Sequence, residues 1–161
     1  MTKAQYLSWF DEVVGPTESI FRLVPPDKLD WKLTEESFTL GQLLRHMPGA
    51  LFFFAKVINN EEWPAKSLRE VMVANRTHPS TTVEEAIAKL GSSTIAFKGA
   101  IDALSEEQFQ NEMVDTPQKG RVGYWRYCAF ALEHHIHHVM EMHLNLKLLG
   151  VKVNTKTLYT G

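Results

Sequence analysis

Apolar residues along the chain recur at alternating intervals of three and four, the spacing of a helix with one buried face. The first such run passes through Phe10, Val14, Thr17, Phe21 and Val24. Gly15 and Pro16 interrupt this run, and a proline inside a helix removes a backbone donor. We therefore expect the first helix to be kinked or split in two at that point. Residues 24–38 contain consecutive prolines and are predicted to be a connection.

A second helix is predicted to begin at Leu40. Thr39 and Gln42 have the spacing of a capping box, in which each side chain bonds a backbone amide of the first turn. The apolar positions that follow are Leu40, Leu43, Leu44, Met47, Leu51, Phe54 and Ile58. Pro48 lies inside this pattern and predicts a local kink.

Two further helices are predicted in the middle of the chain. Ser67 and Glu70 suit the start of a short helix that reaches Ala74. Thr82 and Glu85 form another capping box, and the three-four repeat then continues over residues 83–104. This segment is the third long helix.

The last long helix is predicted over residues 124–149 and ends at Gly150, in a position that favours glycine. Residues 105–123 contain proline and glycine punctuation and are predicted to be a connection. We find no strand-like alternation in the sequence. Four long amphipathic helices joined by loops predict an all-α fold, a four-helix bundle.

Composition supports one domain over residues 1–161, because 161 residues with 44% hydrophobic content can bury a real core. Seventeen basic and nineteen acidic side chains give a net charge of −2, without a basic run that would bind nucleic acid. No apolar run is long enough to span a membrane. The single cysteine, Cys128, excludes an intrachain disulfide and fits a cytoplasmic protein.

The histidines of the fourth helix are the main candidates for chemistry. Its buried face is predicted to comprise Trp125, Cys128, Leu132, His135, Val139, Met142, Leu146 and Leu149. His135 lies in that apolar face, so we expect a structural or supporting role for it. His134 and His138 are four residues apart, so their side chains project one above the other and can reach one cation. His143 points about 180° away from His134 and is not expected to join them.

A metal site needs a third protein ligand, and only His46 and His78 remain. His46 lies between the apolar rows of Leu43 and Met47 on the second helix, so its side chain is expected to face the bundle interior or its rim. His78 lies in a loop next to a proline. His46 is therefore the better candidate for the third ligand.

Other interpretations of these residues are weaker. A lone buried histidine is usually a hydrogen-bonded core residue, but several buried imidazoles without a ligand would leave many ring nitrogens to satisfy. The HExxH motif of zinc proteases and the paired Glu-x-x-His motifs of di-iron bundles are absent. Cys128 lies on the predicted buried face, where a thiol is usually packing and not a nucleophile.

Two segments resemble the signatures of DinB-like metal-binding four-helix bundles. The first is LDWKLTEESFTLGQLLRHM, in which a Leu-Asp-Trp turn precedes the helix that carries His46. The second is EHHIHHVMEMHLNLKLLG, with two histidines four residues apart and a glycine twelve residues after the second. The resemblance covers roughly residues 28 to 57 and 122 to 151, and it implies His46, His134 and His138 as the ligands.

The resemblance also implies an activity, because members of the family include metal-dependent S-transferases that use thiols such as bacillithiol or mycothiol. Three neutral imidazoles would hold a divalent ion, most simply Zn²⁺ or Ni²⁺, with a coordination position open. We expect the partners to be a small-molecule thiol and an electrophile, and a homodimer is one compatible assembly. Glu141 is the expected catalytic residue, as a general base, a fourth ligand or an acceptor that orients an imidazole. The alternatives are a metal-dependent hydrolase and a non-enzymatic metal-binding or stress-associated protein.

Overall fold

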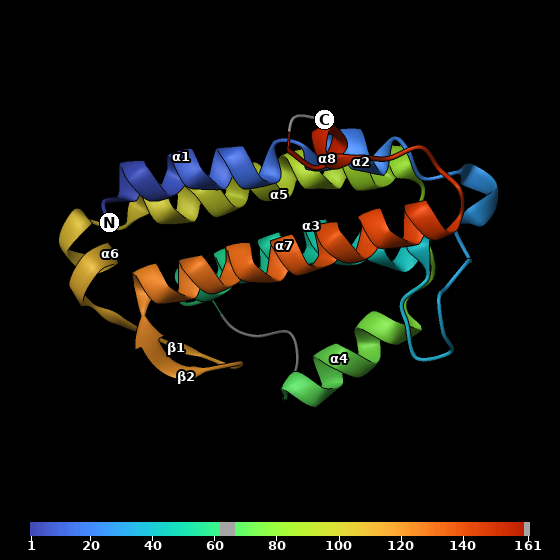
Figure 1. Cartoon of the computed structure of the whole chain (residues 1–161). Helices are drawn as coiled ribbons and strands as arrows, with labels where there is room; N and C mark the ends of the chain where they lie inside the picture. Colours follow the sequence, from blue (N-terminus) through green and yellow to red (C-terminus); the bar gives the residue numbers. More distant parts are fainter. Residues whose placement is uncertain (62–66, 160–161) are drawn as a thin grey trace.

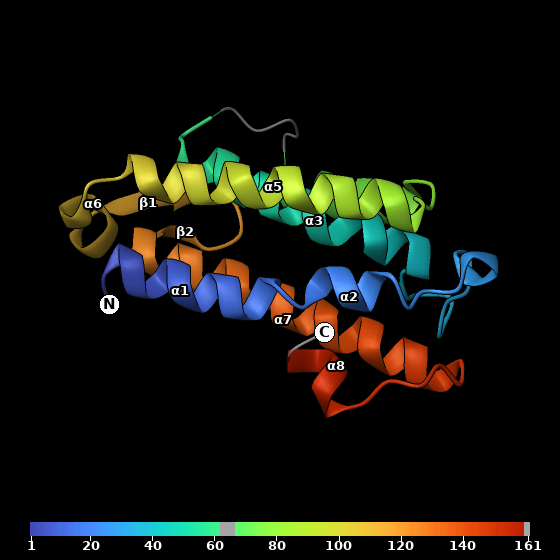
Figure 2. The ribbon, with the colours of Figure 1, turned by 90° about the horizontal axis from the view of Figure 1, so that it is seen from above.

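Four long rods of helix form the molecule in a computed structural model that describes residues 1–61 and 67–159 (Figures 1 and 2). The rods are α1 and α2 in succession, α3, α5 and α7, so the structure confirms the four-helix bundle. The elements are α1 (Lys3–Val14), α2 (Thr17–Phe21), η1 (Pro26–Lys28), α3 (Leu40–Ile58), α4 (Leu68–Thr77), α5 (Val83–Ala103), α6 (Glu106–Asn111), β1 (Met113–Thr116), β2 (Gly120–Gly123), α7 (Tyr124–Leu148) and α8 (Thr155–Tyr159). In the described part of the chain, every helix is too short or too polar to cross a membrane.

Capping interactions set where the long helices begin. The capping boxes of Thr39 with Gln42 and of Thr82 with Glu85 are both formed, so α3 and α5 begin where the sequence predicted. A third box, Thr2 with Gln5, starts α1 at Lys3, earlier than the apolar repeat indicated. The chain does split at Gly15 and Pro16, because α1 ends at Val14 and α2 begins at Thr17.

The core lies between the apolar faces of the four rods. All seven apolar positions predicted for α3 are buried, and α3 continues through Pro48. On α7 the predicted face is buried except at its two ends. Trp125 is 44% exposed, so its assignment to the core was wrong. The physical reason is its place in the first turn of α7, where its indole lies beside Gly123 of the preceding strand.

The connection predicted over residues 105–123 contains ordered elements that the sequence did not reveal. Helix α6 is followed by the antiparallel strands β1 and β2, which pair Met113 with Gly123 and Thr116 with Gly120. Each strand has only four residues, too few for alternation to be recognised from sequence alone. The η1 turn and α8 were likewise not predicted, and α4 extends to Thr77, beyond the expected Ala74.

Gly41 in the first turn of α3 allows two segments to meet. Its amide donates to the carbonyl of Leu29 over 2.8 Å, and its carbonyl accepts from the amide of Thr81 over 3.2 Å. A Cβ at Gly41 would lie 2.4 Å from Cβ of Ser80 and 3.0 Å from its Cα. Both the loop before α3 and the turn before α5 are therefore held against this helix at a point that only glycine accommodates.

We predict that Gly41→Ala lowers the free energy of unfolding by about 1–3 kcal/mol, because backbone as well as side chain must move. Gly91→Ala is the matched control, since Gly91 is also within a helix and a Cβ there meets nothing within 4 Å. It should raise stability by up to about 1 kcal/mol through helix propensity. Urea unfolding of both variants measures the difference, and equal stabilities would contradict the proposed close approach.

Candidate metal centre

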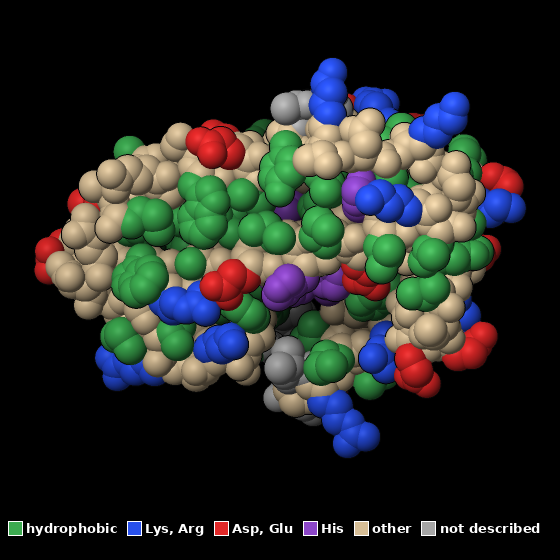
Figure 3. Space-filling model, in the orientation of Figure 1, with side chains coloured by type: hydrophobic (Ala, Val, Ile, Leu, Met, Phe, Trp, Pro, Cys, Tyr) green, Lys and Arg blue, Asp and Glu red, His purple; other side chains and the backbone are tan. Residues whose placement is uncertain are grey.

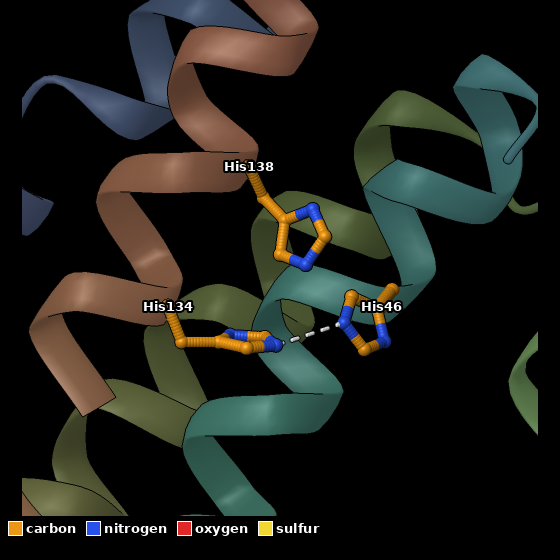
Figure 4. Close-up of side chains that lie close together, drawn as sticks. All are labelled: His46, His134 and His138. Carbon is orange, nitrogen blue, oxygen red and sulfur yellow. Dashed lines mark hydrogen bonds between the residues drawn. The ribbon is translucent and has the colours of Figure 1, made fainter. Parts of the chain in front are cut away.

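Three imidazoles from two neighbouring helices converge at the middle of the bundle. His46 lies in the second turn of α3, and His134 and His138 lie on successive turns of α7. The rings point toward one another (Figure 4), and one nitrogen from each lies within 4.8 Å of the others. We call these three residues the histidine cluster. The helical spacing of four on α7 stacks two of the rings, and the packing of α3 against α7 adds the third.

The spacing of the histidine cluster suits one small cation. Nε2 of His46 lies 3.3 Å from Nε2 of His134. Two nitrogen ligands about 2.0–2.1 Å from a tetrahedral zinc ion are about 3.3–3.4 Å apart. The two atoms thus already have the separation of ligands to one ion.

Glu141 contacts the cluster from the next turn of α7. Its Oε2 lies 2.8 Å from Nδ1 of His138. An ionised carboxylate only accepts, so Nδ1 of His138 is the donor and Nε2 is the nitrogen of that ring that faces the other two histidines (Figure 4). Such a carboxylate contact is the usual way in which a metal-binding imidazole is oriented. Of the roles expected for Glu141, this orienting contact is the one present in the structure.

Aromatic side chains surround the same rings. Phe38 stacks on His46 with ring centres 5.0 Å apart and an interplanar angle of 24°. Phe54 meets His134 edge to face, with centres 5.6 Å apart. These contacts restrict the rotation of both imidazoles and remove them from water. The sequence did not predict that Phe38 contacts the histidine cluster. Its only signal is its position one residue before Thr39, the N-cap of the helix that carries His46.

Burial keeps His46 and His134 uncharged at neutral pH. It lowers the pKa of His46 to about 4 and the pKa of His134 to about 3, and the neighbouring His138 lowers both further. Imidazole binds a metal in its neutral form. Three half-buried histidines with converging nitrogens, one of them oriented by a carboxylate, therefore fit a divalent ion that accepts nitrogen ligands, such as Zn²⁺.

The remaining candidates lie outside the cluster. His135 is buried, and its Nε2 lies 2.8 Å from the hydroxyl of Thr17 on α2, so it joins two helices as a core residue. The polar Thr17 in the apolar repeat of the first rod was the only sequence signal for that partner. His78 and His137 are exposed, and His143 is buried without joining the cluster. Cys128 is fully buried, and burial raises the pKa of its thiol, which opposes a nucleophilic role.

A large pocket opens beside the histidine cluster. Its volume is about 1130 Å³, and His46, His134 and Glu141 line it. Other walls come from α4, from residues 36–38 just before α3, and from the loop between β1 and β2. Histidine side chains lie at the edge of a hollow between α7 and α4 (Figure 3). A small molecule in this pocket can reach the cluster.

Comparisons with known proteins identify the family and the fold. A family model described as the DinB superfamily matches residues 10–142. The crystal structure of a DinB-like protein from Bacillus subtilis is 20% identical, covers 92% of this chain and 94% of its own, and has a TM-score of 0.68. A DinB-like protein from Bacillus cereus is 14% identical, covers 95% of this chain and 96% of its own, and has a TM-score of 0.75. No curated protein matched the chain. At these identities the solved structures show the shared fold.

We predict that His46→Ala, His134→Ala and His138→Ala each weaken Zn²⁺ binding by about 100-fold or more, because two nitrogens hold the ion much less tightly than three. His137→Ala, which alters an exposed residue between two cluster members, should bind as the parent does. His135→Leu should also keep the ion and chiefly lower stability, since it removes the contact with Thr17. Competition titration with a chromogenic chelator measures the affinities, and undiminished binding in the first three variants would end the assignment.

The lowered pKa values of His46 and His134 predict how the metal-free protein responds to acid. In the unfolded chain an imidazole has a pKa of about 6.5, so below that pH the unfolded state binds protons that the folded state excludes. The free energy of unfolding should have its full value above about pH 6.5 and should decrease steadily as the pH falls toward about 4. Urea unfolding in EDTA at pH 7.5, 6.0 and 5.0 tests this, and His134→Gln should show a shallower decline.

Proposed function

Because the chain belongs to the DinB superfamily and carries three converging histidines beside a pocket, we propose that it is a metal-dependent enzyme that transfers a low-molecular-weight thiol to an electrophile. The proposed ligands are His46, His134 and His138, and the proposed ion is Zn²⁺ or Ni²⁺. A cytoplasmic location belongs to this proposal, since thiols are kept reduced there.

The observation that carries the proposal is the access from the pocket to the histidine cluster. A structural zinc site is closed by four protein ligands, whereas a catalytic site has three and keeps a position for substrate. Within residues 1–61 and 67–159, the cluster consists of three residues, and two of them line a pocket of about 1130 Å³. An open site of this size favours catalysis over metal storage.

Each residue of the site has a defined task in this proposal. A divalent ion on neutral imidazoles lowers the pKa of a thiol that it binds and so provides a nucleophile near pH 7. Glu141 holds the proton on Nδ1 of His138, which directs the other nitrogen of that ring toward the cluster. The side chain of Glu141 is 35% exposed and lines the pocket, so its carboxylate is placed to receive the thiol proton. Phe38 and Phe54 keep water from the rings of His46 and His134.

The proposed reaction is a substitution at carbon. The thiol loses its proton to Glu141, the sulfur forms a bond to the electrophilic carbon, and the bond from that carbon to its leaving group breaks. The leaving group departs with the electron pair of that bond, and Glu141 returns its proton to solvent. No oxidant or reductant is required.

Two other functions use the same site. A water molecule in place of the thiol would make the protein a hydrolase. A protein that binds the ion without catalysis would need no pocket, which makes this the weaker candidate.

We predict that the Zn²⁺- or Ni²⁺-loaded protein converts 1-chloro-2,4-dinitrobenzene and a thiol such as bacillithiol, mycothiol or cysteine to the thioether. Glu141→Gln should lower kcat by about 100-fold when the metal is saturating, because it removes the proton acceptor. It should also weaken metal binding by about 10-fold, because an amide orients the imidazole less strongly. The absorbance of the thioether and a chelator titration give these two readouts.

Three controls define the meaning of the result. His137→Ala should react as the parent does, because His137 is exposed and outside the cluster. Chelation should abolish transfer, and added ion should restore it. Hydrolysis of ester or amide substrates without thiol transfer would favour the hydrolase, and a loaded protein that catalyses neither reaction would favour the non-enzymatic alternative.

A further inference from the structure

The pocket beside the histidine cluster has two chemically different halves along α3. On the side toward the start of α3, its walls include Gln42, Arg45 and Arg76, which are polar or charged. On the side toward the end of α3, its walls include Gly49, Ala50, Phe53, Phe54 and Phe130, which we call the aromatic half. His46 precedes the aromatic half by one turn of α3, so the cluster lies between the two.

The aromatic half is continuous with the histidine cluster. The ring of Phe54 contacts His134 at a centre distance of 5.6 Å and Phe130 at 5.7 Å, in each case edge to face. Phe54 is almost fully buried, but Phe130 is only partly buried and lines the pocket. An aromatic side chain that leaves part of its surface on a cavity wall can accept a further ring in the same geometry. Nζ of Lys119 lies 4.7 Å from the centre of the Phe130 ring and covers one of its faces, so a further ring would meet the edge or the other face of Phe130 within the pocket.

Gly49 makes room for that ring. It lies on the exposed surface of α3 that lines the pocket, and a Cβ built on it meets nothing within 4 Å. Glycine inside a helix costs about 1 kcal/mol relative to alanine, and packing within the protein does not require it here. A side chain at this position would project into the pocket, and glycine leaves that space open.

The charged side chains of the other half are already engaged. Arg76 pairs with Glu36 over 3.5 Å, and Nε of Arg45 donates to the carbonyl of Pro79 over 2.8 Å. This half of the pocket, with its two arginines in place, suits a polar molecule that forms hydrogen bonds better than an apolar one. A volume of about 1130 Å³ exceeds the usual range of about 300–1,000 Å³ for small-ligand sites, so two small molecules fit.

We propose that the aromatic half of the pocket binds a planar aromatic ring, and that this ring belongs to the electrophile while the polar half receives the thiol. The assignment of the ring to the electrophile rests on the proposed function; the binding of the ring does not. The flat ring stacks against Phe130 and covers Gly49, and its reactive carbon then faces the histidine cluster one helical turn away.

Substitution of Gly49 tests this proposal. A Cβ at Gly49 meets nothing within 4 Å, so Gly49→Leu extends a side chain into the pocket, and we expect the variant to fold and bind Zn²⁺ as the parent does. It should weaken the binding of 2-naphthol by about 10-fold or more, measured by calorimetry on the Zn²⁺-loaded protein. Gly91→Leu is the matched control, because it makes the same change on α5 where a Cβ also meets nothing within 4 Å. Its affinity for 2-naphthol should be unchanged.

A second variant is independent of α3. Phe130→Leu keeps an apolar side chain on α7 but removes the ring. It should weaken the binding of 2-naphthol, and it should leave the binding of cyclohexanol, an aliphatic alcohol, as in the parent. In turnover with 1-chloro-2,4-dinitrobenzene, Gly49→Leu should raise KM for the electrophile and leave KM for the thiol unchanged.

The outcomes separate the two proposals. Parental 2-naphthol affinity in Gly49→Leu, or equal binding of cyclohexanol and 2-naphthol by the parent, would overturn the aromatic half as a ring-binding site. Naphthol binding that is lost in Gly49→Leu and kept in Gly91→Leu supports the site even if no thiol transfer is detected, in which case the proposed function alone fails.

Discussion

The packing of α3 against α7 is the constraint on which the rest of the site depends. His46 and His134 are 88 residues apart in the chain, yet their Nε2 atoms are 3.3 Å apart because these two helices lie side by side. In the common core α3 buries its whole predicted apolar face and α7 buries its face except at the two ends, and that burial sets the register between them. A shift of either helix by one turn would move an imidazole by about 5.4 Å and disperse the cluster.

The same packing makes the site chemically competent at a cost in stability. Removing His46 and His134 from water lowers their pKa values, so both are neutral ligands at pH 7, but the folded state then loses stability in acid. Phe38 and Glu141 hold two of the rings in place before any ligand arrives. Such preorganisation reduces the entropy lost on binding, and an ion that binds only the folded state would offset the cost of burying polar rings.

Local sequence signals were reliable where a few adjacent residues control the structure. The capping residues Thr39 and Thr82 bond amides three positions away, and Gly15 with Pro16 breaks the first rod by local geometry. The signals failed where tertiary contacts control the outcome. The four-residue strands β1 and β2 exist through pairing with each other, and Trp125 is exposed because it lies in the first turn of α7, beside Gly123 of the preceding strand.

The sequence by itself determined the four helical rods, the face that each one buries, and the stacked pair of His134 and His138, since helical periodicity is a local property. The sequence also indicated that His135 points in a different direction around the helix axis from that pair. The contact of His135 with Thr17 became apparent only in the fold. The contact of Glu141 with His138 joins residues three apart on α7, so helical spacing places these two side chains together as well. Tertiary structure alone decided the distance from His46 to the pair and the pocket whose walls come from α3, α4, α7 and the β1–β2 loop. These features depend on how separate elements pack in space, and the energy that sets this packing is summed over the whole core and not encoded at any one position.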